Sequence, residues 1–118
     1  MNDDINNNDL IRLSTVAEKT GISVHCIKNY VDQGVIQVCD RTTGRLLLFN
    51  EVAIKRLCFI KTARDAGVPL AKTISLLLTD DKGDTEMTNR LLVELNQYIL
   101  DTRRKVSRFE QNLTTLEQ

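Results

Sequence analysis

A chain of 118 residues is long enough for one modest hydrophobic core but too short for a core plus a large ligand pocket, which counts against an enzyme. The formal net charge is zero, yet residues 10–78 hold ten Lys and Arg against five Asp and Glu, a surplus of five positive charges. This electropositive middle segment favours an anionic partner, although so modest a surplus is also typical of an ordinary solvated surface.

The chain begins with an acidic, polar segment, MNDDINNND, which we expect to be a disordered tail over residues 1–9. It lacks the basic and then apolar composition of a signal peptide. The sequence contains no apolar run of the roughly 18 residues that a membrane span requires. We therefore expect a cytoplasmic protein without a membrane partner.

Two short predicted helices follow, joined by the sequence TGIS. Ser14 is a candidate N-cap for the first helix, and Gly21 closes it as a C-terminal glycine does. Ser23 then caps a second helix, which ends at Gly34 and has apolar residues at helical spacing. These apolar residues are Val24, Ile27 and Val31. Two short helices joined in this way predict a helix-turn-helix.

The second predicted helix carries His25, Lys28, Asn29 and Asp32 on its polar face. These side chains can donate and accept hydrogen bonds at base edges and phosphates, as a DNA recognition helix requires. The alternative is an ordinary amphipathic helix with a hydrated side.

A β-hairpin is predicted next. Residues 35–40, VIQVCD, have the β-branched, alternating pattern of a short strand, residues 41–44 form a turn, and residues 45–49, RLLLF, form the returning strand. Asn50 then caps a helix that ends before Gly67, and a further helix starts at Pro69. The order helix, helix, hairpin, helix, helix predicts a winged helix-turn-helix with a trailing pair.

From residue 85 onward, apolar or nearly apolar residues recur at intervals that alternate between three and four. They are Leu92, Leu95, Ile99, Thr102, Val106, Phe109, Leu113 and Leu116. This spacing is typical of a coiled-coil seam, here on a helix about 50 Å long at 1.5 Å per residue. The seam could pack back on its own domain, but a small domain covers only part of such a helix. We therefore expect a homodimer.

The stretches IRLSTVAEKTGISVHCIKNYVDQGVI and FNEVAIKRLCFIKTARDAGVPLAKTISLL, with a hairpin between them, resemble the MerR family of bacterial transcription regulators over residues 11–78. In that family the motif between the helices runs Val-Ser-x-x-Thr-Ile-Arg-x-Tyr-x-x-x-Gly-Leu. The matching residues here are Ile22, Ser23, Ile27, Lys28, Tyr30, Gly34 and Val35. Within the family the chain looks most like the MerD branch, whose members are secondary regulators of mercury-resistance operons.

The resemblance implies an all-α fold with a small β-hairpin, in which a winged helix-turn-helix is followed by a helix pair and a long antiparallel coiled-coil dimerisation helix. We expect the DNA-binding domain over residues 10–78, a linker over residues 79–84 and the dimerisation helix over residues 85–118.

The resemblance also implies that residues 23–33 enter the major groove of promoter DNA. Lys28 stands where relatives carry a DNA-contacting arginine, and Tyr30 where they carry a phosphate-contacting tyrosine. The candidate readers near base edges are His25, Cys26 and Asn29, beside the cap Ser23. Arg12 and Ser14 lie at the start of the first helix, where contacts with the DNA backbone are expected.

The predicted hairpin over residues 35–49 is the wing of this fold, and its sequence departs from the family pattern. Family wings read Gly-Tyr-Arg-x-Tyr, with an arginine that grips phosphate, and by this alignment Leu47 takes the arginine's place. Leu46 and Phe49 are expected to pack inward, and Leu47 to point away from the following helix, because side chains alternate along a strand. Arg41 and Arg45 at the hairpin tip are the candidate substitutes for the missing phosphate contact.

Cys26, Cys39 and Cys58 are spaced for neither a disulfide framework nor a CxxC metal knuckle, and we expect free thiols. His25 beside Cys26 is a poor ligand pair, because neighbouring helical residues point about 100° apart. Mercury sensors of the family use cysteines at the start of the dimerisation helix and in the loop after it, whereas no cysteine follows Cys58 here. The resemblance therefore implies no metal site and no cofactor.

The implied function is a transcriptional regulator or co-regulator that binds a palindromic promoter operator as a homodimer, without sensing metal itself, and down-regulates a mercury-resistance operon. The alternative is an interaction protein that heterodimerises with a full-length MerR-type activator and binds little DNA of its own. RNA polymerase is a further candidate partner. An enzyme is the least supported class, because the sequence offers no nucleophile with a base, no paired carboxylates and no phosphate-binding glycine loop.

Overall fold

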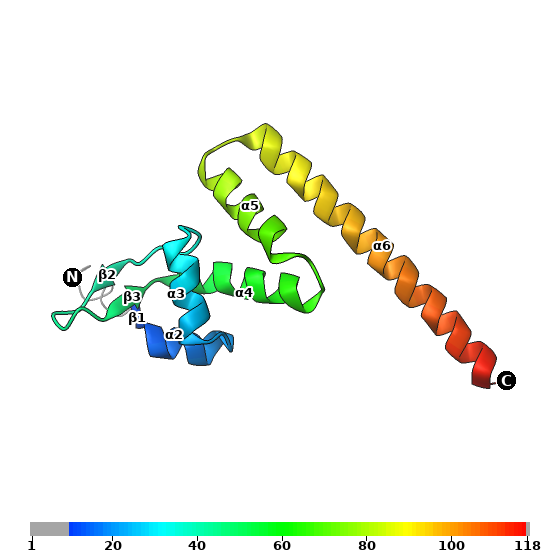
Figure 1. Ribbon diagram of the computed structural model, residues 1–118, viewed down its shortest axis with the longest axis horizontal. Coiled ribbons are helices and arrows are strands. Elements are labelled where there is room, and N and C mark those ends of the chain that lie inside the picture. Colours follow the sequence, from blue (N-terminus) through cyan, green and yellow to red (C-terminus); the bar gives the residue numbers. More distant parts are fainter. Residues whose placement is uncertain (1–9, 118) are drawn as a thin grey trace. The chain divides into compact units, whose positions relative to one another are not determined.

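The computed structural model describes residues 10–117, so the tail expected over residues 1–9 lies outside it. The described chain forms two compact units, residues 10–78 and residues 79–117. In chain order the elements are β1 (Ile11–Arg12), α2 (Leu13–Thr20), α3 (Val24–Asp32), β2 (Asp40–Arg41), β3 (Leu47–Phe49), α4 (Glu51–Asp65), α5 (Leu70–Asp81) and α6 (Thr85–Glu117) (Figure 1). The predicted class, mainly helical with a small sheet, is confirmed.

Local capping signals set most helix ends. The Ser23 side chain accepts a hydrogen bond from the amide of Cys26 at 3.2 Å, and Asn50 accepts one from the amide of Ala53 at the same distance. Both caps were predicted, and both satisfy an amide that the first turn of a helix leaves unpaired. Gly21 ends α2 with φ of 73°, in the left-handed region that glycine adopts without steric cost.

The first helix begins two residues earlier than its sequence suggests. Its N-cap is Arg12, in extended conformation and without a side-chain capping bond, so the prediction that Ser14 caps this helix is wrong. Arg12 also belongs to β1, and the extended strand leads directly into the helix. A strand of two residues is too short to leave a periodic pattern in the sequence.

The sheet has three antiparallel strands in the order β1-β3-β2. In its register Ile11 faces Phe49 and Asp40 faces Leu48. The strand predicted over residues 35–40 is reduced to its last residue, because Val35 and Ile36 are buried in a turn after α3. Their β-branched side chains fill the core.

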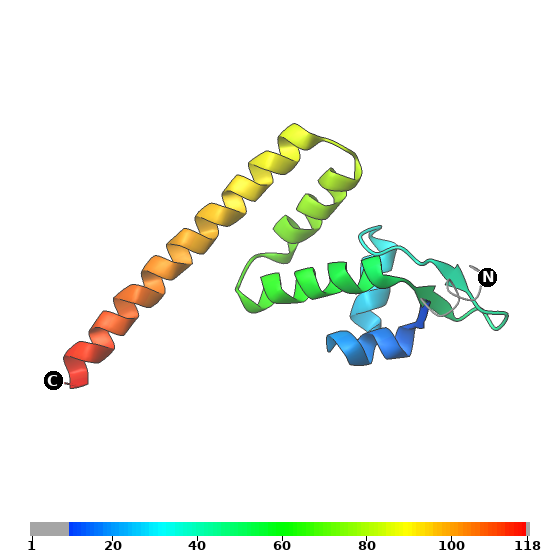
Figure 2. The same cartoon turned by 180° about the vertical axis from the view of Figure 1, so that it is seen from behind.

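One hydrophobic core holds residues 10–78 together. Helices α2 and α3 lie against α4, and the sheet lies at the amino-terminal end of α4 (Figure 2). The buried cluster consists of Val16, Ile22, Ile27, Tyr30, Val35, Ile36, Phe49, Ala53, Leu57 and Ile60. Ile74, Leu77 and Leu78 of α5 pack against it, so α5 closes the core on another side.

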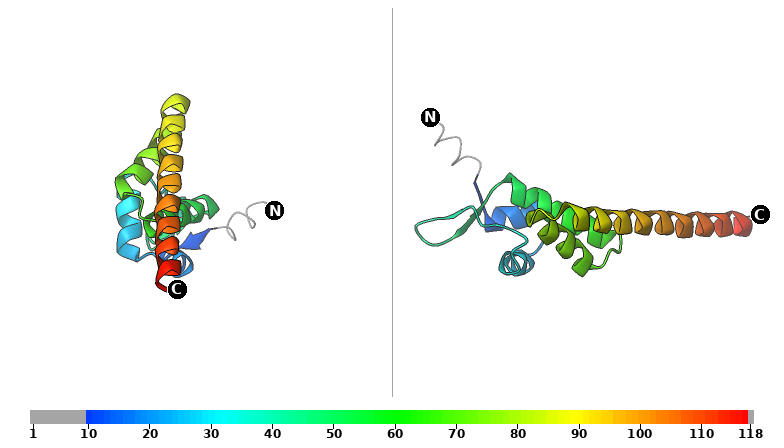
Figure 3. Two further views of the ribbon diagram at one scale, coloured as in Figure 1. Left: turned by 90° about the vertical axis from the view of Figure 1, so that its right-hand side faces the viewer. Right: turned by 90° about the horizontal axis from the view of Figure 1, so that it is seen from above.

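The last helix differs from the others, since none of its described side chains is buried. It runs for 33 residues without interruption (Figure 3). Its predecessor α5 continues to Asp81, three residues into the segment expected as a linker, and only residues 82–84 separate the two helices.

Candidate nucleic-acid interface

Helix α3 buries one face and exposes another. Ile27 and Tyr30 lie in the core, at 0% and 3% exposure. His25, Lys28 and Asn29 are exposed. The exposed set can donate hydrogen bonds to phosphates and exchange them with base edges, as expected of a recognition helix.

Two candidate contact residues on α3 are less accessible than expected. The Tyr30 ring is part of the core, which restricts any phosphate contact to its hydroxyl group. Cys26 is half-buried and packs against the same core. Both were assigned from their place in a family motif, and the motif alone does not show which face of the helix they occupy.

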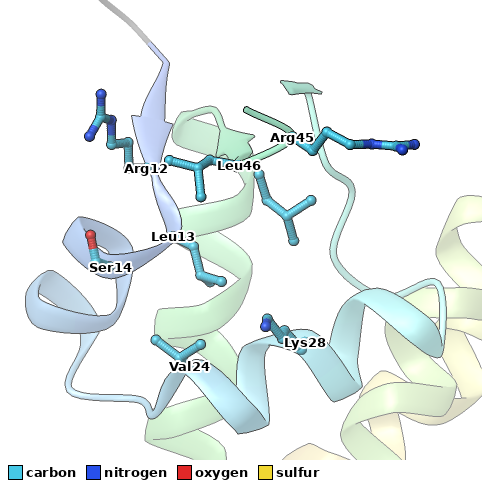
Figure 4. A pocket seen from close by; sticks show the side chains of 8 residues that line it. Arg12, Leu13, Ser14, Val24, Lys28, Arg45 and Leu46 are labelled. Carbon is cyan, nitrogen blue, oxygen red and sulfur yellow. The ribbon is translucent and has the colours of Figure 1, made fainter. Parts of the chain in front are cut away.

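A hollow of about 300 Å³ separates α3 from the wing and from the start of α2 (Figure 4). It is lined by Arg12, Leu13, Ser14, Val24, Lys28, Arg45, Leu46 and Leu47. The structure thus brings together four of the predicted contact residues, Arg12, Ser14, Lys28 and Arg45. The guanidinium ends of Arg12 and Arg45 point outward from opposite sides of it (Figure 4).

The lining of this hollow matches the chemistry of a nucleic-acid backbone. Three cationic side chains and one hydroxyl surround apolar side chains, and no carboxylate is among the lining residues. Cations and hydroxyl groups contact phosphate, and apolar side chains can pack against deoxyribose. Leu13, Val24 and Leu46 were missed as candidate contacts, because an apolar residue carries no sequence signal for this role.

The wing tip holds a cation on a strained backbone. Arg45 has φ of 67°, and it is the one non-glycine residue with positive φ among residues 10–117. The turn is closed by hydrogen bonds from the Arg45 amide to the Thr42 carbonyl at 2.8 Å and from the Leu46 amide to Thr42 Oγ1 at 3.0 Å. Strain of this kind is often retained where a side chain has a function. Arg41, also exposed, lies outside the lining of the hollow.

Replacing Arg45 with glycine should move stability and DNA binding in opposite directions. Glycine removes the left-handed strain, so the free energy of unfolding should rise by about 0.5–1 kcal/mol. Loss of one phosphate contact per protomer should weaken duplex binding and reduce the salt slope by about 0.9 per contact. Thermal unfolding and salt-titrated anisotropy measure the two effects. Unchanged binding with increased stability would remove Arg45 from the interface.

The structure orients the two leucines of the wing in the reverse of the predicted way. Leu46 is 53% exposed, whereas Leu47 is half-buried and packs against the core. Phe49, at 0% exposure, fixes the inward face of β3, and alternation gives Leu47 the same face. The predictions that Leu46 packs inward and Leu47 points away are therefore wrong. Of the two leucines, Leu46 is the one open to solvent.

A phosphate-binding arginine should therefore be tolerated at residue 46 and resisted at residue 47. Leu46→Arg should tighten duplex binding and steepen the salt slope by about 0.9 per wing. Leu47→Arg should lower the free energy of unfolding by about 1–3 kcal/mol, because it brings a charge to a packed position. Salt-titrated anisotropy and thermal melting on the two variants separate the positions. Equal melting temperatures for both would contradict the assignment of faces.

The predicted seam of α6 is largely exposed within one chain. Six of its eight residues are at least 42% exposed, and Leu95 and Thr102 are half-buried. Leu116 reaches 83% and Phe109 61%. An apolar row of this length is typical of a surface that a partner covers.

The described residues contain neither a group of three or more His, Cys, Asp and Glu side chains that could hold a metal ion nor a helix long and apolar enough to cross a membrane. The three cysteines are free thiols, with Cys39 and Cys58 exposed.

Comparison with known proteins adds a family assignment. Residues 11–79 match the family model described as MerR HTH family regulatory protein. The HTH-type transcriptional regulator MerD of Serratia marcescens is 30% identical over 104 residues, which cover 88% of this chain and 86% of the relative.

Solved structures show the same fold. A protein described as a MerR family transcriptional regulator, from Listeria monocytogenes, has a TM-score of 0.72 at 19% identity and covers 91% of this chain and 80% of its own. HiNmlR, a MerR family regulator lacking the sensor domain and bound to promoter DNA, has a TM-score of 0.69 at 19% identity and covers 88% of this chain and 78% of its own.

Proposed function

Because the chain belongs to the MerR family of helix-turn-helix regulatory proteins, we propose that it is a transcriptional regulator or co-regulator that binds a palindromic promoter operator as a homodimer. It works without sensing a metal ion itself. Its target is DNA in the cytoplasm, and the MerD-type resemblance suggests that this DNA lies in a mercury-resistance operon.

The observation that carries this proposal is the exposed polar face of α3 next to a cation-lined hollow. Lys28 belongs to both, so a helix seated in the major groove would place an adjacent phosphate near Arg12 and Arg45. The structural neighbour HiNmlR is described as bound to promoter DNA, which supports DNA as the partner. Direct base contacts then fall to His25 and Asn29.

The dimer is proposed from the exposed seam of α6. A second copy of the same seam would cover the apolar row, and a two-fold dimer matches a palindromic site with half-sites about 34 Å apart. The proposed regulator does not sense metal, because the sequence has no cysteine after Cys58. Inducer sensing would then belong to another protein.

A second function uses the same seam differently. The chain could pair through α6 with a full-length MerR-type activator and weaken it as a heterodimer, with RNA polymerase as the affected partner. The leucine-rich wing favours this alternative, since Leu46 and Leu47 replace the phosphate contact of other family wings. The two functions differ in the DNA affinity of the purified protein alone.

Sequencing the genomic DNA fragments that the purified protein retains tests the proposal. A DNA-binding homodimer should enrich an imperfect palindrome, and the enriched duplex should then bind in a gel shift at physiological salt. Retention of no common sequence, together with binding only after a MerR-type activator is added, would favour the heterodimer.

A further inference from the structure

Two cationic side chains of α4 bind backbone carbonyls on either side of α3. Lys61 Nζ donates to the Thr20 carbonyl oxygen at 3.1 Å, before α3. Arg56 Nη1 donates to the Val35 carbonyl oxygen at 2.9 Å, after α3. Both bonds are partly buried and span 41 and 21 residues of sequence, so they are tertiary contacts.

The placement of these cations suits the carbonyls that they bind. Ala53, Leu57 and Ile60 form the buried stripe of α4, and at about 100° per residue Arg56 and Lys61 lie on its two edges. Thr20 ends α2, where the helix dipole leaves partial negative charge and a cation is favoured. A methyl group added at Gly21 would lie 2.5 Å from Lys61 Nζ, so the lysine ammonium group lies directly beside this turn.

These contacts add to the restraint that core packing places on α3. Ile27 and Tyr30 anchor one side of α3 and so fix its rotation about its own axis. The turns at which the chain enters and leaves the helix add a further restraint on sliding along that axis and on tilting. The entering turn is held by the Lys61 bond and the leaving turn by the Arg56 bond.

We propose that Lys61 and Arg56 are positioning residues for DNA recognition, which hold α3 at the height and tilt at which its exposed side chains meet base edges. This proposal rests on the proposed function, because it assumes that α3 reads DNA. Neither residue needs to touch DNA. Lys61 and Arg56 should therefore affect discrimination between DNA sequences, because that depends on the geometry of α3. They should affect the nonspecific attraction of cations for phosphate much less.

The test uses Lys61→Met in the full chain, with Lys55→Met as the matched control. Lys55 is an exposed lysine of the same helix, so its replacement removes the same charge. Kd is measured for the operator duplex and for a scrambled duplex, below the melting temperature of every variant. Lys61→Met should reduce the ratio of the scrambled-duplex Kd to the operator Kd about tenfold, the effect of losing one charge-assisted hydrogen bond. Lys61→Arg should restore the ratio, and Lys55→Met should keep it.

Hydrogen exchange on the free protein tests the positioning without DNA. The amides of Gly21 and Ile22 bond to the Ala17 carbonyl oxygen and to Thr20 Oγ1, and both should exchange about tenfold faster in Lys61→Met and at the normal rate in Lys55→Met. Unchanged exchange and an unchanged ratio would overturn the proposal, as would a lower melting temperature with the ratio intact. If the wild-type protein shows no operator preference, the proposed function fails, while the exchange rates still report on the two bonds. Arg56→Met repeats the test if Lys61→Met does not fold.

Discussion

Replacing Phe49 with alanine should lower the free energy of unfolding of the DNA-binding unit by about 3–5 kcal/mol. Phe49 has 0% exposure and is the largest fully buried side chain among the described residues. It pairs with Ile11 in the sheet and directly precedes the cap Asn50, so its loss opens a cavity where the wing, β1 and α4 meet. A domain of this size has only about 5–15 kcal/mol in total, so the loss is a large share of its stability.

The chain supplies a matched control for this effect. Phe59 on α4 is 40% exposed, and Phe59→Ala removes the same side chain without opening an enclosed cavity. Phe59→Ala should lower the free energy of unfolding by only about 1 kcal/mol. Chemical denaturation of both variants gives the comparison, and equal losses of stability would show that Phe49 does not anchor the core.

A charge in the exposed seam of α6 should separate the proposed dimer. Ile99 is 44% exposed in the single chain and lies in the middle of the alternating three and four pattern. Ile99→Asp would bury an unpaired carboxylate between two helices. The cost of several kcal/mol should exceed the free energy of dimerisation that a coiled coil of this length provides. The variant should be a monomer, and its operator affinity should fall by orders of magnitude, because each monomer contacts a single half-site.

Ser107→Asp is the control, since it adds the same charge to an exposed residue of α6 outside the seam. Light scattering at micromolar concentration should report a dimer for the wild-type protein and for Ser107→Asp, and a monomer for Ile99→Asp. A monomeric wild-type protein would contradict the seam assignment.

The sequence predicts most of the helices here because their signals are local. Ser23 and Asn50 cap helices three residues ahead of the amides that they bind, and Gly21 ends one in a conformation that favours glycine. Such signals lie within a few residues of each other. The failure at Ser14 has a tertiary cause, because pairing between β1 and β3 fixes Arg12 as extended and starts the helix at Leu13.

The wing could be predicted only in part. Alternation separates Leu46 from Leu47 correctly, but it does not say which of the two faces the core. That choice is made by Phe49, whose partner Ile11 lies 38 positions away in sequence. Val35 and Ile36 have the β-branched pattern of a strand, yet they are core residues in a turn. Burying their apolar side chains stabilises the fold whatever the conformation of the backbone.

The candidate interface was predicted from polarity and only partly from geometry. His25, Lys28 and Asn29 are exposed as expected, whereas the Tyr30 ring is needed in the core. The hollow between α3 and the wing could not be predicted from the sequence, because its lining comes from three separate segments, residues 12–14, 24–28 and 45–47. Its cations become a single site only when the sheet brings β1 and the wing together.

DNA reading by α3 is tested most directly by one ratio, the Kd for a scrambled duplex divided by the Kd for the retained operator. The measurement compares wild-type protein with a variant carrying His25→Ala, Lys28→Ala and Asn29→Ala. All three side chains are exposed, so the variant should keep its fold and melting temperature. The ratio should be large for the wild-type protein and should fall to near one for the variant. A variant that keeps the wild-type ratio would contradict the assignment of α3 as the recognition helix.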